Sequence, residues 1–131
     1  MPELPEVETT LKAIKSFEKK ILNSVSIHNP NLRWLVDNDI NKKIAGKKVR
    51  QIFRRAKYLI FDFNDFQLIV HLGMSGTLRI MNKGDNFYKK HDHAELMFSK
   101  SKLIYNDPRR FGSIHVTEKY TEHFLLKNLG P

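Results

Sequence analysis

Hydrophobic residues in the first part of the chain recur every three or four positions, which is the spacing of one face of an amphipathic helix. The apolar positions of this pattern are Leu4, Val7, Leu11, Ile14, Phe17 and Ile21. Pro5 suits the first helical turn because its missing N–H would have no partner there. The pattern therefore predicts a long N-terminal helix over residues 4–21. A second, shorter helix is expected from Asp37 to Ala45, with Asp37 as its cap and Gly46 as its stop.

After Gly46 the hydrophobic pattern changes from helical to alternating, and apolar runs rich in β-branched and aromatic residues are separated by turn residues. The expected strands are Lys48 to Arg54, Tyr58 to Phe63, Gln67 to Leu72, Thr77 to Met81, His93 to Ser99, Lys102 to Asn106 and Ser113 to Val116, with a further one at Val25 and Ile27. Short strands without alternating helices predict a mostly β fold, an antiparallel sandwich or barrel with the N-terminal helix packed on it. The tail from Lys119 to Leu129 is expected to be helical and to stop at Gly130-Pro131, which is typical of the start of a linker.

The 131 residues are enough for one domain, and their composition limits the partners. The formal net charge is +9, with 23 Lys and Arg against 14 Asp and Glu, so a polyanion is the expected partner. The chain has no Cys, which excludes disulfides and thiolate metal sites. No apolar run approaches the ~20 residues that span a bilayer. We therefore expect a protein inside the cell that is not bound to a membrane.

Basic residues are concentrated between Lys42 and Lys57, a segment without any acidic residue. One interpretation is a solvated strand face. However, Arg54, Arg55 and Lys57 crowd the junction between two apolar strands, where like charges repel each other unless an anion neutralises them. A phosphate backbone would neutralise them.

Two glycine-containing turns carry the next candidates. The segment His71-Leu-Gly-Met-Ser-Gly76 leaves a strand through two glycines and would bring His71 and Met74 toward a partner, although Met74 alone would suit a core. The segment Asp107-Pro-Arg-Arg-Phe-Gly112 places Arg109 and Arg110 beside Phe111. Cations for phosphates and a flat apolar wedge for the space of a displaced base are what entry into a duplex requires. The alternative is that Phe111 packs in the core.

His91-Asp92-His93 has the spacing that would put two imidazoles on one side of a strand. A metal pair is conceivable on that spacing. No third ligand is evident, however, and the neighbouring Lys89 and Lys90 would repel a cation. We expect no metal site in this chain.

The N-terminus combines an amine and a carboxyl group. Removal of Met1 would leave Pro2 as a secondary amine, and an α-amino group has a pKa of about 7.7–8, so much more of it is unprotonated at neutral pH than of a Lys side chain. Glu3 follows directly and can exchange protons with whatever the amine attacks. Together they are a minimal set for Schiff-base chemistry on a sugar carbon.

Five segments in this order resemble one known family. They are Met1-Pro-Glu-Leu-Pro-Glu-Val-Glu-Thr9, Arg55-Ala-Lys-Tyr-Leu59, His71-Leu-Gly-Met-Ser-Gly76, Lys90-His-Asp-His93 and Asp107-Pro-Arg-Arg-Phe-Gly112. Together they are similar to the N-terminal catalytic domain of bacterial formamidopyrimidine-DNA glycosylase. Leu4, Val7-Glu8-Thr9 and Phe111 favour this branch over the sister branch of endonuclease VIII, which prefers oxidised pyrimidines.

The resemblance implies a two-layer antiparallel β-sandwich with flanking helices, and an enzyme that removes 8-oxoguanine and formamidopyrimidines from double-stranded DNA and then nicks the strand as an AP lyase. By residue-by-residue match, Pro2 would attack C1′, Glu3 would donate a proton to the opening deoxyribose, Glu6 would be a supporting carboxylate, and Lys57 would donate a proton in β-elimination and contact phosphate. DNA contacts would come from His71, His91, Arg109 and Arg110, and the gap left by the flipped nucleotide would be filled by Met74, Arg109 and Phe111.

The resemblance also implies what residues 1–131 do not contain. Family members continue with a helix-two-turn-helix domain and a four-cysteine zinc finger, so a structural zinc is expected only there and no cofactor in this chain. We expect an isolated catalytic domain with weak, salt-sensitive DNA binding and little activity alone, monomeric and associated with the nucleoid in a bacterial cytoplasm. The competing interpretations are an oxidised-pyrimidine glycosylase, a non-catalytic DNA-binding module and a small basic RNA-binding barrel.

Overall fold

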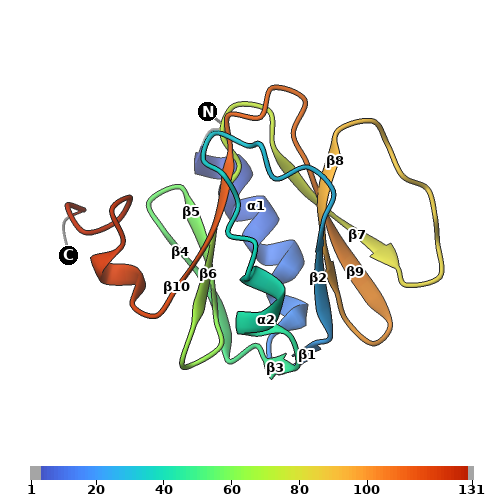
Figure 1. The fold of residues 1–131 in the computed structure, drawn as a ribbon, viewed down its shortest axis with the longest axis horizontal. Helices are drawn as coiled ribbons and strands as arrows, with labels where there is room; N and C mark the ends of the chain where they lie inside the picture. Colours follow the sequence, from blue (N-terminus) through green and yellow to red (C-terminus); the bar gives the residue numbers. More distant parts are fainter. Residues whose placement is uncertain (1–3, 130–131) are drawn as a thin grey trace.

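The computed structural model describes residues 4–129, which form two four-stranded antiparallel sheets packed face to face (Figure 1). The first sheet has the order β10-β6-β5-β4 and the second β2-β8-β9-β7. The strands are β2 (Ser24–Ile27), β4 (Gln51–Arg55), β5 (Tyr58–Asp62), β6 (Gln67–His71), β7 (Thr77–Asn82), β8 (Asp92–Met97), β9 (Ser101–Asn106) and β10 (Ser113–Thr117). The expectation of a mostly β fold is confirmed, and the architecture is the two-layer sandwich rather than the barrel.

Two helices close the open sides of the sandwich. Helix α1 (Leu4–Ile14) contacts β4 and β7, the edge strands on one side, and α2 (Ile40–Ile44) contacts β2 and β10 on the other. Their buried side chains join those of both sheets in one core cluster, to which α1 contributes Val7, Leu11 and Ile14. No helix within residues 4–129 is long and apolar enough to cross a membrane.

The expected N-terminal helix over residues 4–21 is too long. Helix α1 ends at Ile14, a 3-10 turn η1 (Lys15–Phe17) follows, and Ile21 starts the two-residue strand β1 (Ile21–Leu22), which pairs with β3 (Lys47–Lys48). The Glu18 carboxylate accepts a 2.7 Å hydrogen bond from the Ile52 N–H of β4, which holds the chain beyond the 3-10 turn against the sheet. Tertiary contacts therefore replace helical hydrogen bonds before the hydrophobic period ends.

The second helix also begins later than expected, at Ile40 instead of Asp37. The Asp37 carboxylate accepts hydrogen bonds from the Asp39 N–H at 2.8 Å and from the Lys43 ammonium at 2.7 Å. Asp37 thus organises the turn that precedes the helix. Gly46, with φ of 80°, follows the helix as the predicted stop.

The C-terminal segment is not the expected helix over residues 119–129. It contains a 3-10 turn η2 (Tyr120–Glu122) followed by further turns that lie over the outer face of the first sheet. Leu126 is buried there against Ile60 and Ile69, which point away from the main core. The strands β5 and β6 are therefore covered on both faces. The conformation of this segment is therefore determined by packing on the sheet surface and not by a helical spacing of its apolar residues.

His115 lies on this outer face of β10, where the C-terminal segment covers it. Its ring centroid is 4.8 Å from that of His123, and its Nε2 is buried without a hydrogen-bond partner among the described residues. Burial, and to a smaller extent the neighbouring His123 and His71, lower the pKa of His115 to about 4. The imidazole is therefore neutral in the folded protein near pH 7.

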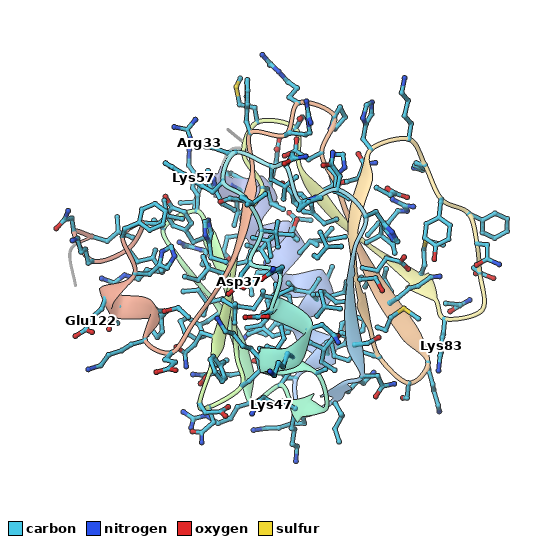
Figure 2. All side chains as sticks on the ribbon, in the orientation of Figure 1. Arg33, Asp37, Lys47, Lys57, Lys83 and Glu122 are labelled. Atoms are coloured by element: carbon cyan, nitrogen blue, oxygen red, sulfur yellow. The ribbon has the colours of Figure 1, made fainter. Side chains whose placement is uncertain are left out.

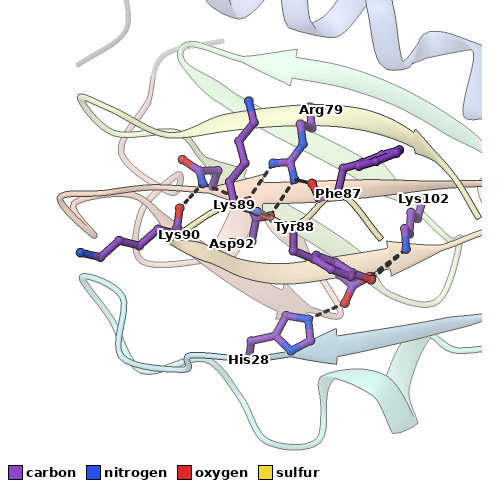
Figure 3. A network of polar contacts seen from close by, with 10 residues as sticks. His28, Arg79, Phe87, Tyr88, Lys89, Lys90, Asp92 and Lys102 are labelled. Atoms are coloured by element: carbon purple, nitrogen blue, oxygen red, sulfur yellow. Dashed lines mark hydrogen bonds and ion pairs between the residues drawn. The ribbon is translucent and has the colours of Figure 1, made fainter. Parts of the chain in front are cut away.

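A polar network covers the outer face of the second sheet, beneath the loop between β7 and β8 (Figure 3). The buried Lys102 ammonium lies 3.7 Å from the Glu95 carboxylate and donates to the Tyr88 hydroxyl at 2.8 Å. Burial raises the pKa of Asp92, but hydrogen bonds, chiefly from the Arg79 guanidinium at 2.6 and 2.8 Å, outweigh it and hold that pKa at about 2. These contacts fix the loop that leads into β8.

Two connections pass from one sheet to the other at the same end of the sandwich. Residues 72–76 join β6 to β7, and residues 107–112 join β9 to β10. They touch backbone to backbone, because a Cβ on Gly73, whose φ is 68°, would lie 2.6 Å from the Gly112 nitrogen. A Cβ on Gly112 would lie 2.0 Å from the Tyr105 hydroxyl. We call these connections the paired loops.

The carboxylate of Asp107, which is fully buried, joins the paired loops. Its Oδ1 accepts hydrogen bonds from the Ser75 hydroxyl at 2.7 Å and the Arg110 N–H at 3.1 Å. Its Oδ2 accepts from the Tyr105 hydroxyl at 2.7 Å and the Gly112 N–H at 2.9 Å. One side chain thus satisfies donors from β9 and both loops.

Asp107→Asn is expected to lower the free energy of unfolding by about 2–4 kcal/mol, because an amide NH₂ cannot accept the hydrogen bonds that one carboxylate oxygen receives. The midpoint of thermal unfolding should fall by about 10 °C or more. Asp39→Asn is the matched control, since Asp39 makes no side-chain cap hydrogen bond and should change stability by less than about 0.5 kcal/mol. Equal midpoints for the two variants would contradict the role of Asp107.

Stability is expected to fall on acidification between about pH 6.5 and 4. The pKa of His115 is lowered in the folded state, so the unfolded chain binds the proton first and unfolding becomes more favourable as pH falls. His115→Leu should remove about 2 kcal/mol of this loss. The measurement is the midpoint of thermal unfolding at pH 7.5 and 5 for both proteins, and an equal decrease in both would refute the assignment.

Candidate nucleic-acid interface

One row of side chains crosses the first sheet at the end that carries the paired loops. Strand register places Arg55 opposite Tyr58, Tyr58 opposite His71, and His71 opposite Ser113. Lys57 lies in the tight turn between β4 and β5, beside this row. The strand register therefore places Lys57 and His71 at the same end of the molecule.

The crowded cations of this turn are partly neutralised by the protein itself. Arg54 forms an ion pair with Glu8 of α1 and donates to the Ala56 carbonyl at 3.2 Å. Arg55 donates to the Leu129 carbonyl at 3.4 Å. The expectation that this cluster needs an external anion is therefore too broad, because helix α1 supplies the counter-charge for Arg54.

His71 is a neutral imidazole amid positive charges. Burial is the main cause that lowers its pKa, and the charges of Arg33 and Lys57 lower it further. The ring lies 4.8 Å from that of Tyr58, and its Nε2 is buried without a hydrogen-bond partner among residues 4–129. A neutral imidazole can donate or accept one hydrogen bond without adding to the local repulsion.

The paired loops present an exposed tip of apolar and cationic side chains. Met74 is 53% exposed and Phe111 44% exposed, so the alternative that either residue packs in the core is wrong. The guanidinium carbon of Arg109 lies 5.0 Å from the centre of the Phe111 ring, and the Arg109 N–H donates to the Ser75 hydroxyl at 3.3 Å. We call Met74, Arg109 and Phe111 the loop tip.

Arg33 and Trp34 are also at this end, although no sequence pattern singled them out. The Arg33 N–H donates to the Gly112 carbonyl at 3.2 Å, so its segment packs on the paired loops. The guanidinium lies 5.5 Å from the Trp34 ring, which is 42% exposed. The available signal was an Arg beside an aromatic residue, the same combination as in the loop tip. Figure 2 shows Arg33 and Lys57 at this same end of the molecule.

The two histidines of the expected pair lie close together, with ring centroids 6.1 Å apart, but only His93 belongs to a strand. His91 precedes β8 with φ of 72°, and the pairing of β8 with β9 is irregular between Asp92 and Ala94. His93 is buried and its Nε2 is 2.8 Å from the Asp107 carbonyl, whereas the His91 carbonyl accepts from the Asp107 N–H. His91 is therefore anchored beside the paired loops. Among the described residues, no group of three potential metal ligands is present.

The remaining expected residues differ in what can be said of them. Arg110 is exposed, with φ of 55°, in the same loop as Arg109. Glu6 is exposed in the first turn of α1, and the ion pair of Glu8 with Arg54 brings that turn to the end of β4. Pro2 and Glu3 lie outside the described residues.

The arrangement combines three capacities at one end of the sandwich. Cations can bind phosphates, a neutral imidazole can form a directed hydrogen bond, and an exposed apolar tip can enter a base stack. The tip is held on both sides by the Asp107 network, so it need not be ordered when it binds.

Comparison with known proteins gives a consistent result. Residues 1–114 match the family described as the formamidopyrimidine-DNA glycosylase N-terminal domain. The chain is 46% identical over 133 residues to the formamidopyrimidine-DNA glycosylase of Pasteurella multocida, and 48% identical over 134 residues to that of Hydrogenovibrio crunogenus. Each alignment covers 100% of this chain and 48% of the relative.

Solved structures with this fold contain damaged DNA. One is a complex of the Lactococcus lactis protein Fpg with DNA that contains an abasic site, with a TM-score of 0.87 and 34% identity over 99% of this chain and 50% of that chain. Another is MutM in complex with DNA that contains carbocyclic 8-oxoguanine, with a TM-score of 0.87 and 36% identity over 99% of this chain and 51% of that chain.

The chain spans about half the length of the curated relatives it matches. The matched region nonetheless contains the paired loops, the row across the first sheet and helix α1. On these grounds the chain belongs to the formamidopyrimidine-DNA glycosylase N-terminal domain family.

Proposed function

We propose that the chain provides the catalytic half of a base-excision repair enzyme, a DNA glycosylase and AP lyase that removes oxidised purines from double-stranded DNA. The observation that carries the proposal is the loop tip, in which Met74 and Phe111 remain exposed beside Arg109. Chemistry at C1′ of a stacked nucleotide requires extrusion of that nucleotide, which costs a few kcal/mol. Inserted apolar side chains offset part of this cost.

The proposed chemistry uses the residues at the N-terminus. After loss of Met1, the Pro2 nitrogen attacks C1′, the bond from C1′ to the base breaks, and a Schiff base forms between Pro2 and the opened sugar. Glu3 donates the proton to the opening deoxyribose, and Glu6 supports the local charge. Lys57 contacts phosphate and donates a proton during β-elimination, which breaks the strand. The position of Lys57 in the turn beside His71 supports this role.

DNA binding is assigned to the cations and imidazoles of the same end. His71, His91, Arg109 and Arg110 contact the backbone around the lesion, and Arg33 is an additional candidate because it packs on the paired loops. Met74, Arg109 and Phe111 fill the space of the extruded nucleotide. The neutral state of His71 allows close contact with the neighbouring cations while a phosphate is bound.

The rival functions make different predictions. An RNA-binding barrel would present stacking aromatics on a strand face. In the described part of the chain, the exposed aromatic residues Trp34, Phe87, Tyr88, Phe111 and Phe124 all lie outside the strands, which disfavours that function. A preference for oxidised pyrimidines would be revealed by a panel of defined lesions. A non-catalytic DNA-binding module would bind without forming a covalent adduct.

Borohydride trapping tests the proposed nucleophile. The chain with Pro2 as its first residue should form a covalent adduct with a duplex that contains an abasic site or 8-oxoguanine, because reduction makes the Schiff base permanent. The same chain with a short N-terminal extension should form none, since the Pro2 nitrogen is then an amide. Intact mass measures both the start of the chain and the adduct. Equal amounts of adduct with and without the extension would refute Pro2 as the nucleophile. The absence of an adduct with the full-length parent protein, starting at Pro2, would favour the non-catalytic binding module.

Phe111→Ala should slow adduct formation about tenfold, because an inserted aromatic contributes about 1–3 kcal/mol against the unstacked base. Phe87→Ala is the matched control, since Phe87 is also an exposed loop phenylalanine, at 75%, but belongs to the loop over the second sheet. It should leave the rate unchanged. Trapping rates at low salt measure both variants, and equal slowing by the two would contradict the wedge.

A further inference from the structure

A second basic surface lies at the opposite end of the sandwich from the paired loops. Its side chains line two neighbouring clefts of about 520 Å³ each, one along β3 and the hairpin between β5 and β6, the other between η1 and the hairpin between β8 and β9. The basic residues of these clefts, which we call the basic pole, are Lys19, Lys20, Lys47, Lys48, Arg50 and Lys100. None of them belongs to the candidate interface described above.

The protein neutralises only part of the basic pole. Lys47 pairs with Asp65 at 2.6 Å, and Arg50 lies 3.3 Å from Asp62. Lys48 and Lys100 are exposed, and within residues 4–129 neither forms an ion pair. Like charges gathered without counter-charges raise the electrostatic free energy of the folded chain, and a bound polyanion lowers it.

The strands themselves separate the basic pole from the paired loops. In β5 and β6, register places Tyr58 and His71 at one end and Asp62 and Gln67 at the other. Strands of five or six residues span about 15–20 Å. Figure 2 shows Lys47 at the opposite end of the molecule from Arg33 and Lys57. A straight duplex seated on the loop tip therefore cannot also reach the basic pole.

The surroundings of the basic pole favour the backbone of a duplex over single-stranded nucleic acid. Single strands are bound by basic grooves that also offer aromatic faces for stacking. Phe17, Phe63 and Phe98 line these clefts, but they are only 2%, 5% and 1% exposed. Lysine ammonium groups without accessible stacking surfaces bind phosphates irrespective of sequence.

We infer that the basic pole is a second DNA-binding site, which holds the phosphate backbone of another duplex segment while the loop tip engages the first. The choice of DNA rests on the proposed function, since the first site would already place the protein among DNA segments. A second segment held by the same molecule is at a high effective concentration, so the protein can pass between segments without dissociating into solution.

A capture experiment tests this second site. An undamaged duplex is immobilised and loaded with the 131-residue protein, and a second, fluorescent duplex is added at ~50 mM salt. The wild-type protein should capture the second duplex. The protein concentration used for loading is one at which light scattering of the protein in solution reports a monomer. Lys48→Glu with Lys100→Glu should reduce capture at least about tenfold and lower the salt slope of capture by about 2.

The matched control is Lys119→Glu with Lys127→Glu, which changes the net charge equally at exposed positions in the C-terminal segment. It should capture the second duplex nearly as well as the wild type, and both variants should unfold at similar temperatures. Equal capture by the two variants overturns the inference, as does competition by polyglutamate as strong as that by duplex of equal charge. Loss of capture only in the pole variant supports the inference even if trapping through Pro2 fails, so the two proposals fail separately.

Discussion

The buried carboxylate of Asp107 holds together the two connections that pass between the sheets, and the geometry of the candidate interface depends on it. Four donors from Ser75, Tyr105, Arg110 and Gly112 converge on its two oxygens. The loops can approach so closely because neither Gly73 nor Gly112 carries a side chain at their contact. The hydrogen bonds of this carboxylate and the contact between the two glycines thus hold the same short stretch of backbone in place. As a result, the loop tip is fixed by the fold before any DNA arrives, and binding need not order it.

The same constraint determines how charge is distributed at this end of the molecule. Arg109 and Arg110 follow Asp107 after Pro108, and Arg33 packs on the same loop through the Gly112 carbonyl. Burial lowers the pKa of His71, and the charges of Arg33 and Lys57 lower it further, so the ring stays neutral and is not repelled by these cations. The interface therefore offers fixed positive charges for phosphates and one neutral group for a directed hydrogen bond. This division of roles is suited to a ligand whose charge lies on its backbone and whose identity lies in its bases.

Most of the strands could be predicted from the sequence because they are buried between the two sheets or under the C-terminal segment. Burial requires long apolar runs, such as that of β5, and these runs are visible in the sequence. The end of α1 could not, since the hydrogen bond from Ile52 to Glu18 joins residues far apart in the chain. The prediction of a helix in the C-terminal segment failed for a similar reason, because the spacing of its apolar residues is set by the sheet surface that they cover. At the interface, motifs identified His71, Met74, Arg109 and Phe111, and the structure brings them to one end. Arg33 was missed because its segment has no period and its place depends on a backbone contact with Gly112.

An exposed apolar tip is a liability for a free protein, since such surfaces promote association. Here Met74 and Phe111 are flanked by cations, and the guanidinium of Arg109 lies over the Phe111 ring. The positive charge of these cations keeps copies of the protein apart, but the cations also repel one another within one loop. Asp107 offsets this repulsion from beneath, since its carboxylate lies within the same turn and is screened from water by complete burial. The buried acid is thus a hydrogen-bond acceptor for the loops and a counter-charge for the cations above it. An amide at this position would keep one acceptor oxygen but lose the negative charge and the two hydrogen bonds that the other oxygen accepts. This explains why one carboxylate, and not a set of separate contacts, lies at the centre of this end of the sandwich.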